Sequence, residues 1–283
     1  MLKPKQTEKT MKIVLGLMAI IPVAIMLYIF GYLVVNGISA INPEFLLGFP
    51  RMGGIEGGIF PAIVGTVYVV TICLIVAVPL GVGAAIYLVE YAPNNQLTKT
   101  IRFFVECLAG IPSIIIGLFG YVFLVYYLKL GFSILAGGLA LAFMVLPWTI
   151  RASEEAIKAV PQHYKEASFA LGAGKWQTIK NVVLKTAFPG ICTGILLALG
   201  KAIGETAVVL FTAGMGSAAF LPTSIFDSAR TLPVHLYIVA TTAHTVAAFE
   251  KAYGTAVVLL GLFLISTLGA IFLRNYYGKM LRG

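Results

Sequence analysis

Residues 62–89 have the sequence AIVGTVYVVTICLIVAVPLGVGAAIYLV, which contains no charged side chain. A helix needs about 20 apolar residues to cross the roughly 30 Å hydrocarbon core of a bilayer. This stretch is long enough, and five other stretches of the chain have the same character. The sequence therefore predicts six transmembrane helices, at about 13–35, 62–89, 103–127, 133–150, 188–212 and 253–273.

The composition of the whole chain agrees with this. Of its 283 residues, 59% are hydrophobic and 11% are charged, whereas soluble domains carry about 25% charged residues. So few charges cannot cover a soluble globule of this size, which excludes a soluble enzyme, a disordered chain and a secreted disulfide scaffold. No polar segment is long enough for a second domain. We expect an all-α polytopic membrane protein with a single transmembrane domain, residues 1–283, in the cell membrane.

Lysine and arginine residues are concentrated in alternate connecting segments. Fifteen of the 20 basic residues fall in the four segments that share a side if the N-terminus is cytoplasmic, namely 1–12, 90–102, 151–187 and 274–283. By the positive-inside rule, both termini are then expected in the cytoplasm. The net charge of +9 is thus a topology signal, and nucleic-acid binding is not expected.

The two long outer segments differ in character. Residues 36–61 hold prolines and a cluster of glycines, a pattern typical of irregular backbone. Residues 213–252 include an apolar stretch, 232–249, that lacks a clean run of about 20 residues. We expect an interfacial or re-entrant helix there rather than a seventh span.

The longest cytoplasmic segment, 151–187, carries a recognisable motif. It contains Glu166-Ala167-Ser168, then three residues, then Gly172. This resembles the EAA loop of ABC-importer permeases, with Ser168 in place of the second alanine. In that family the loop docks on a separate ATPase, and Gly172 would allow a sharp turn after the docking helix.

Three further stretches narrow the resemblance. They are AGIPSIIIGLFG at 109–120, KAIGETA at 201–207 and TLPVHLY at 231–237. From about residue 60 onward the chain resembles the phosphate ABC transporter permeases of the PstA type. The resemblance implies the type I importer (MetI-like) fold and a paralogous permease as heterodimer partner. It also implies two copies of a cytoplasmic ATPase and an extracytoplasmic phosphate-binding protein, with membrane lipid around the spans.

No enzyme chemistry is expected in the chain itself. The sequence Gly172-Ala173-Gly174-Lys175 lacks the spacing and the hydroxyl residue of a phosphate loop. ATP and magnesium would therefore belong to the partner ATPase, and no cofactor or metal is expected here. The three histidines and three cysteines do not form a ligand pattern: His163, His235, His244, Cys73, Cys107 and Cys192.

Two charges lie inside the fifth expected span. Lys201 and Glu205 are four residues apart, and with Gly190 and Gly194 they fall within an arc of about 60° on a continuous helix. Intramembrane charges usually face a partner helix or a wet cavity. The pair is a candidate gate on the substrate pathway, at a glycine-lined seam with the second permease, or else a buried pair that only fixes helix register.

Other candidate pathway residues lie near helix ends. Arg151 and Glu154 are spaced for a pair at the cytoplasmic end of the fourth span, where they are either pathway residues or ordinary flanking charges. Glu106 is expected to be interfacial. Ser113 follows Pro112, which either breaks the third span and frees backbone groups for an anion or only kinks it.

The resulting hypothesis is a permease subunit that imports phosphate. Alternatives are a permease for molybdate, sulfate or phosphonate, a membrane-embedded enzyme, and a stand-alone channel or secondary carrier. The absence of a visible nucleophile, base or metal set disfavours the enzyme, and the docking loop disfavours the channel.

Overall fold

The computed structural model describes residues 4–54, 56–214, 220–242 and 244–282. Within these ranges, five helices are long and apolar enough to cross a membrane, and a sharply bent helix pair makes a sixth candidate. The expectation of an all-α membrane protein is confirmed, and the six expected spans compare with five or six candidates in the structure. The long helices are α1 (Pro4–Gly37), α3 (Phe60–Ile86), α6 (Ile134–Lys158), α9 (Leu184–Ile203) and α12 (Val246–Arg282).

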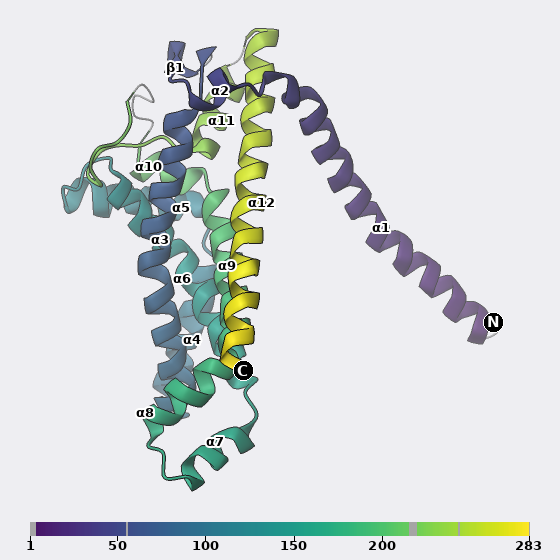
Figure 1. The fold of residues 1–283 in the computed structure, drawn as a ribbon, viewed down its shortest axis with the longest axis vertical. Coiled ribbons are helices and arrows are strands. Elements are labelled where there is room, and N and C mark those ends of the chain that lie inside the picture. The colour runs from purple at the N-terminus through teal and green to yellow at the C-terminus, as the bar shows by residue number, and fades with distance from the viewer. Residues whose placement is uncertain (1–3, 55, 215–219, 243, 283) are drawn as a thin grey trace.

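A bundle of α3, α6, α9 and α12 forms the body of the molecule (Figure 1). α6 is its central helix, because two thirds of its apolar window (67%) is buried. The core of the bundle is rich in small and β-branched residues, which let helices approach closely: Val69, Cys73, Ala77, Val145, Ala198 and Ala202.

Helix α1 stands away from this bundle (Figure 1). Only its C-terminal end is packed, where the Tyr32 ring lies edge-on to Tyr253 of α12, with ring centroids 5.9 Å apart. Gly37 also lies close to the Tyr253 backbone, since a Cβ there would stand 2.5 Å from the Tyr253 carbonyl oxygen. The apolar window of α1 has no buried residue within the chain.

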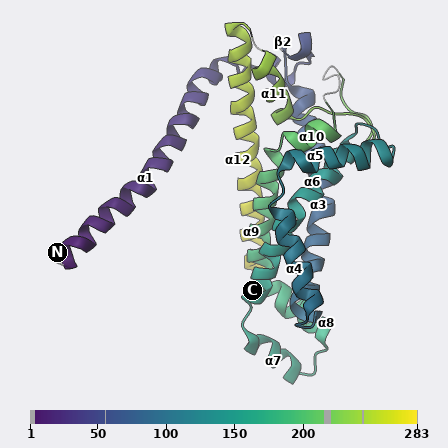
Figure 2. The ribbon, with the colours of Figure 1, turned by 180° about the vertical axis from the view of Figure 1, so that it is seen from behind.

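The third expected span, 103–127, is wrong as a single straight helix. It consists of α4 (Gln96–Ala109), α5 (Ser113–Gly120) and the π-helical η4 (Tyr121–Tyr127), with a bend of 98° between α4 and the rest. Pro112 lacks a backbone N–H and keeps the residue before it out of the helical conformation, so a break here is expected on backbone grounds. Of the two alternatives at Pro112, the break is the one observed. Figure 2 shows α5 projecting sideways from the bundle.

The fifth expected span, 188–212, is wrong at both ends. One continuous helix runs from Lys175 to Ile203, through α8 (Lys175–Thr178), the π-helical η5 (Ile179–Val183) and α9. It ends at Gly204, and a separate short helix, α10 (Ala207–Thr212), follows. The loop at the lower end of Figure 1 is therefore shorter than the segment 151–187, because α6 continues to Lys158 and α8 begins at Lys175.

The opposite end of the bundle carries short elements. They are η1 (Ile38–Ala40), α2 (Pro43–Leu47), η2 (Met52–Gly54), α11 (Leu232–Thr242) and the strands β1 (Pro50–Arg51) and β2 (Glu56–Gly57), which pair antiparallel. With 11 residues, α11 is too short to span a bilayer.

The side chain of His235 of α11 is buried, with 1% exposed. Gly54 lies so close to the His235 ring that only glycine fits there. Gly54 has φ +110°, and a Cβ there would stand 2.7 Å from His235 Cε1. α11 lies outside the candidate spans. Burial, with a smaller contribution from Arg230, lowers the pKa of His235 to about 4, so this side chain is neutral at neutral pH.

Candidate functional site

A cluster of charges joins α4 to α6 at the α7 end of the bundle. Its centre is the carboxylate of Glu154, which is 1% exposed. Arg102 Nε lies 2.8 Å from Glu154 Oε1, and Lys158 Nζ lies 2.7 Å from the same oxygen. Arg151 Nη1 is 3.7 Å from Glu154 Oε2. Separating a buried carboxylate from such partners is costly, so the cluster fixes α4 against α6.

Arg151 joins a second carboxylate to this cluster. Its Nη2 atom lies 2.8 Å from Glu106 Oε1, and both side chains are about half exposed. The expected Arg151–Glu154 pair is therefore the longest contact of a larger group with three cations and two carboxylates. Arg102 was not singled out from the sequence, because its partner Glu154 belongs to a different helix, α6.

The face of α9 that carries Gly190 and Gly194 lies against α6 of the same chain. A Cβ at Gly190 would stand 2.7 Å from Ala156 Cβ, and one at Gly194 would stand 2.4 Å from Ala152 Cβ. The glycines therefore serve close packing, as their spacing indicates, but the helix they approach is not in a second subunit.

Lys201 continues the same line of contacts between α9 and α6. Its Nζ atom lies 4.2 Å from the centroid of the Trp148 ring. In antiparallel helices the contact pairs 190–156 and 194–152 lead one turn further to 198–148. Lys201 lies three residues beyond that register, and its long side chain places the ammonium over the indole of Trp148. No carboxylate of the described residues lies within ion-pair distance of Lys201.

Glu205 does not share a helical face with Lys201. The helix ends between them, and Glu205 Oε1 accepts hydrogen bonds from the backbone N–H groups of Ala207 (3.1 Å) and Val208 (3.3 Å). The carboxylate thus satisfies two donors at the start of α10. The expectation that Lys201 and Glu205 pair on one helical face is wrong, because α9 ends at Gly204. A role of Glu205 on the substrate pathway stays a prediction.

Ser113 lies half-buried at the first residue of α5, directly after the break. Four residues further along α5, Gly117 packs on α10, where a Cβ would stand 3.0 Å from the Ala207 carbonyl oxygen. The two short helices that follow the two breaks therefore pack against each other.

The docking motif lies on a helix that protrudes from the end of the bundle (Figure 2). α7 (Gln162–Ala170) carries Glu166 and Ala167, both exposed, and it has no buried residue. Ser168 Oγ lies 2.9 Å from Thr178 Oγ1, which closes the loop. Gly172 has φ +84°, the left-handed conformation expected of a glycine that ends a helix.

Large apolar side chains surround this motif without cover from the chain itself. Leu171 is 89% exposed and Trp176 is 58% exposed, beside Tyr164 and Phe169. A hollow of about 300 Å³ next to Gly172 is lined by one of them, Leu171.

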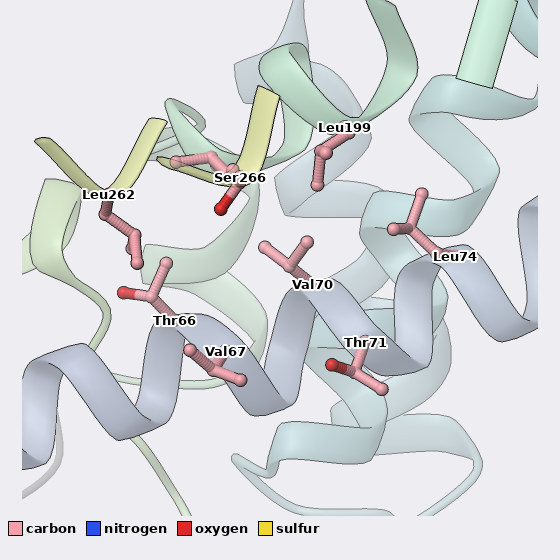
Figure 3. Close-up of a pocket in the computed structure, with 9 residues that line it drawn as sticks. Thr66, Val67, Val70, Thr71, Leu74, Leu199, Leu262 and Ser266 are labelled. Atoms are coloured by element: carbon pink, nitrogen blue, oxygen red, sulfur yellow. The ribbon is translucent and has the colours of Figure 1, made fainter. Parts of the chain in front are cut away.

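A small cavity of about 160 Å³ lies between α3, α9 and α12 (Figure 3). Val70, Leu74 and Leu199 point into it, and its lining residues carry hydroxyls but no charge. One of those hydroxyls, Thr66 Oγ1, is already used, since it donates to Ala62 O and accepts from Leu232 N. An anion there would lose water without gaining a counter-charge, so the cavity does not suit phosphate.

The described residues contain no group of three histidine, cysteine, aspartate or glutamate side chains that could hold a metal ion. The structure combines long apolar helices, breaks after Ala109 and Ile203, the cation Lys201 within a long apolar helix and a protruding loop at α7. These features define the class of a membrane transport permease.

The chain belongs to the family described as "Binding-protein-dependent transport system inner membrane component", which matches residues 77–282. It is 37% identical to the "Probable ABC transporter permease protein YqgI" of Bacillus subtilis, over 98% of both chains. It is 38% identical to the "Phosphate transport system permease protein PstA 1" of Mycobacterium tuberculosis, over 77% of this chain and 71% of that protein. The recognition of a phosphate-permease-like member of this family is thereby confirmed.

Solved structures agree on the fold. A chain of a bacterial alginate ABC transporter in complex with a pentasaccharide-bound periplasmic protein superposes with a TM-score of 0.68, covering 96% of this chain and 98% of that one at 14% identity. A chain of the MetNI methionine ABC transporter in an inward-facing conformation gives 0.55, covering 79% and 94% at 20% identity. The chain is thus a multi-pass inner-membrane permease subunit of an ABC importer with the MetI-like fold.

Proposed function

We propose that this permease carries inorganic phosphate from an extracytoplasmic binding protein into the cytoplasm. The observation that carries the proposal is the intramembrane cation Lys201, without a carboxylate partner among the described residues, in a chain whose relatives include phosphate permeases. Phosphate near neutral pH is a mixture of mono- and dianion. It must lose water between the helices, and a fixed cation lowers that cost.

The indole of Trp148 suits such a role for Lys201. A cation over an aromatic ring gains about 0.5–2 kcal/mol, less than the roughly 1.5–3 kcal/mol of a hydrogen bond to a charged group. Lys201 can therefore leave Trp148 for an anion at small cost and return to it afterwards. The lysine ammonium is a compact point charge, which favours brief contact over bidentate capture.

The charge cluster around Glu154, at the α7 end of the bundle, is proposed as the second place where the anion is bound on its way through the permease. Its three cations exceed its two carboxylates by one, and Arg151 and Lys158 are 41% and 49% exposed. An anion released there meets cations whose charge is mostly compensated by the two carboxylates. It is therefore held weakly and can leave into the cytoplasm. Ser113 is retained as a candidate hydroxyl contact at the break before α5.

The proposed partners are matched by surfaces that the chain leaves uncovered. The unburied face of α1 suits the paralogous second permease, and the apolar patch around Leu171 and Trp176 suits the ATPase. Two ATPase copies would bind ATP and magnesium, with α7 and its motif as the docking segment. The layer of short elements at the opposite end would face the binding protein.

A permease for another oxyanion is the alternative, because charge alone does not distinguish phosphate from sulfate, molybdate or phosphonate. Uptake of labelled phosphate by proteoliposomes holding the whole complex, with each other oxyanion as competitor, separates them. We expect ATP-dependent phosphate uptake that excess sulfate or molybdate leaves unchanged. Uptake of another oxyanion in preference to phosphate would refute the proposal.

Assembly provides a separate test. An ATPase expressed with this chain and its paralogue should co-purify with them, and replacement of exposed Leu171 by aspartate should abolish that association. Exposed Leu118 on α5, far from α7, serves as a control for the loss of one surface leucine. Retained association of the Leu171→Asp variant would remove α7 from the ATPase interface.

A further inference from the structure

Two contacts hold the docking loop to the end of α3. In the first, Lys165 Nζ of α7 lies 2.5 Å from Glu90 Oε1. The two side chains are only 14% and 10% exposed, although they are 75 positions apart in sequence. α7 has no buried residue of its own, so this largely buried pair is its main polar attachment to the bundle.

In the second contact, Lys175 Nζ lies 4.6 Å from the centroid of the Tyr91 ring. Lys175 is the first residue of α8, just after the turn at Gly172. The two lysines therefore stand on either side of the docking loop, and adjacent residues of one helix, Glu90 and Tyr91, hold them both.

The backbone at this point has an unusual form. Tyr87–Tyr91 is the π-helical segment η3, which continues α3 without a break and ends with the Ala92 N–H donating to Tyr87 O at 2.8 Å. Such segments insert a residue into a helix and are frequent at functional sites. Here η3 extends α3 far enough for Glu90 and Tyr91 to reach α7 and α8 respectively.

α3 is in turn the helix most extensively packed on the central helix α6. Gly81 and Gly138 allow this approach, since a Cβ at Gly81 would stand 2.7 Å from Thr149 and one at Gly138 would stand 2.5 Å from Ile72. The helix that holds α7 is thus packed closely on the centre of the bundle.

We propose that Glu90 and Tyr91 are positioning residues that transmit movement of the docking loop to α3, through Lys165 and Lys175. The inference rests on the proposed role of α7 as the ATPase docking segment. It adds that ATPase binding and transport coupling are separable, because the docking surface and the link to α3 use different side chains.

The test uses the whole complex in proteoliposomes and measures ATPase co-purification, ATP hydrolysis and uptake. The main variant is Glu90→Gln with Lys165→Met, which removes both charges and leaves neither buried alone. We expect the ATPase to remain bound and to hydrolyse ATP, while uptake per ATP hydrolysed falls about tenfold, as expected for a lost coupling contact. Lys99→Glu on α4, an exposed lysine of the same end of the bundle, serves as control and should couple normally.

A charge exchange provides the rescue. Glu90→Lys alone should uncouple the complex, and Glu90→Lys combined with Lys165→Glu should restore most of the ratio of uptake to hydrolysis. Normal coupling in the neutral double variant, or an exchanged pair that couples no better than the single variant, would overturn the inference. Retained ATPase association in the Leu171→Asp variant would instead refute the docking role of α7, so the two failures are distinguishable.

Discussion

Replacement of Glu154 by glutamine should destabilise the protein far more than the same replacement at Glu106. The two carboxylates belong to one cluster, and each lies 2.8 Å from an arginine nitrogen. They differ in burial, since the side chain of Glu154 is 1% exposed and that of Glu106 is 55% exposed. The comparison therefore isolates the effect of removing water from an ion pair.

The magnitude follows from the surroundings of each group. Removing one partner of a buried ion pair costs about 3–5 kcal/mol, because the remaining charge is left uncompensated. Arg102 and Lys158 are 28% and 49% exposed and can partly return to water, which reduces the expected cost to about 2–4 kcal/mol. An exposed pair such as Arg151–Glu106 contributes about 0–1 kcal/mol.

Unfolding of the purified chain in mild detergent, by heat or by added denaturing detergent, measures the difference. Glu154→Gln should lower the midpoint clearly, and Glu106→Gln should leave it nearly unchanged. A Glu154→Gln protein as stable as the Glu106→Gln protein would show that the cluster does not hold α4 to α6.

Three further predictions concern packing, pH and the docking turn. Gly194→Ala should destabilise the chain by about 1–3 kcal/mol through contact with Ala152, and adding Ala152→Gly should restore much of the thermal midpoint. In the folded protein the pKa of His235 is about 4, below its ordinary value of 6.5. The stability that its neutral form contributes is therefore complete above pH 6.5 and is lost as pH falls towards 4. A His235→Gln variant should show a smaller fall of the thermal unfolding midpoint over that range. Gly172→Val should destabilise the turn after α7 by about 1–2 kcal/mol because of its left-handed backbone alone, whereas Gly172→Asn should destabilise it less. The rate of limited proteolysis in the loop measures both effects.

The spans could be predicted because apolar length depends only on local composition. Residues 62–89 and 133–150 lie within observed helices for this reason. The bend after Ala109 and the break at Gly204 were less accessible, because apolar sequence continues through both and hydropathy does not register them. Pro112 did carry a backbone signal for the first break, but Gly204 is one glycine among 30.

The candidate site was harder to predict than the spans. Helical spacing correctly placed Gly190, Gly194 and Lys201 on one face, but it could not indicate that this face meets α6 of the same chain. The partner of Lys201 is an indole from another helix, and Arg102 reaches Glu154 only after the chain has turned back. Such contacts depend on how different helices pack together, and residue spacing within one helix does not predict that.

The account depends most directly on the charge of Lys201. Labelled phosphate uptake by the whole complex in proteoliposomes should fall at least about tenfold in Lys201→Met, the loss of roughly 1.4 kcal/mol of anion stabilisation, and should largely return in Lys201→Arg. Co-purification of the ATPase should be the same for both variants. Phosphate uptake by an assembled Lys201→Met complex at the parental rate would contradict the account.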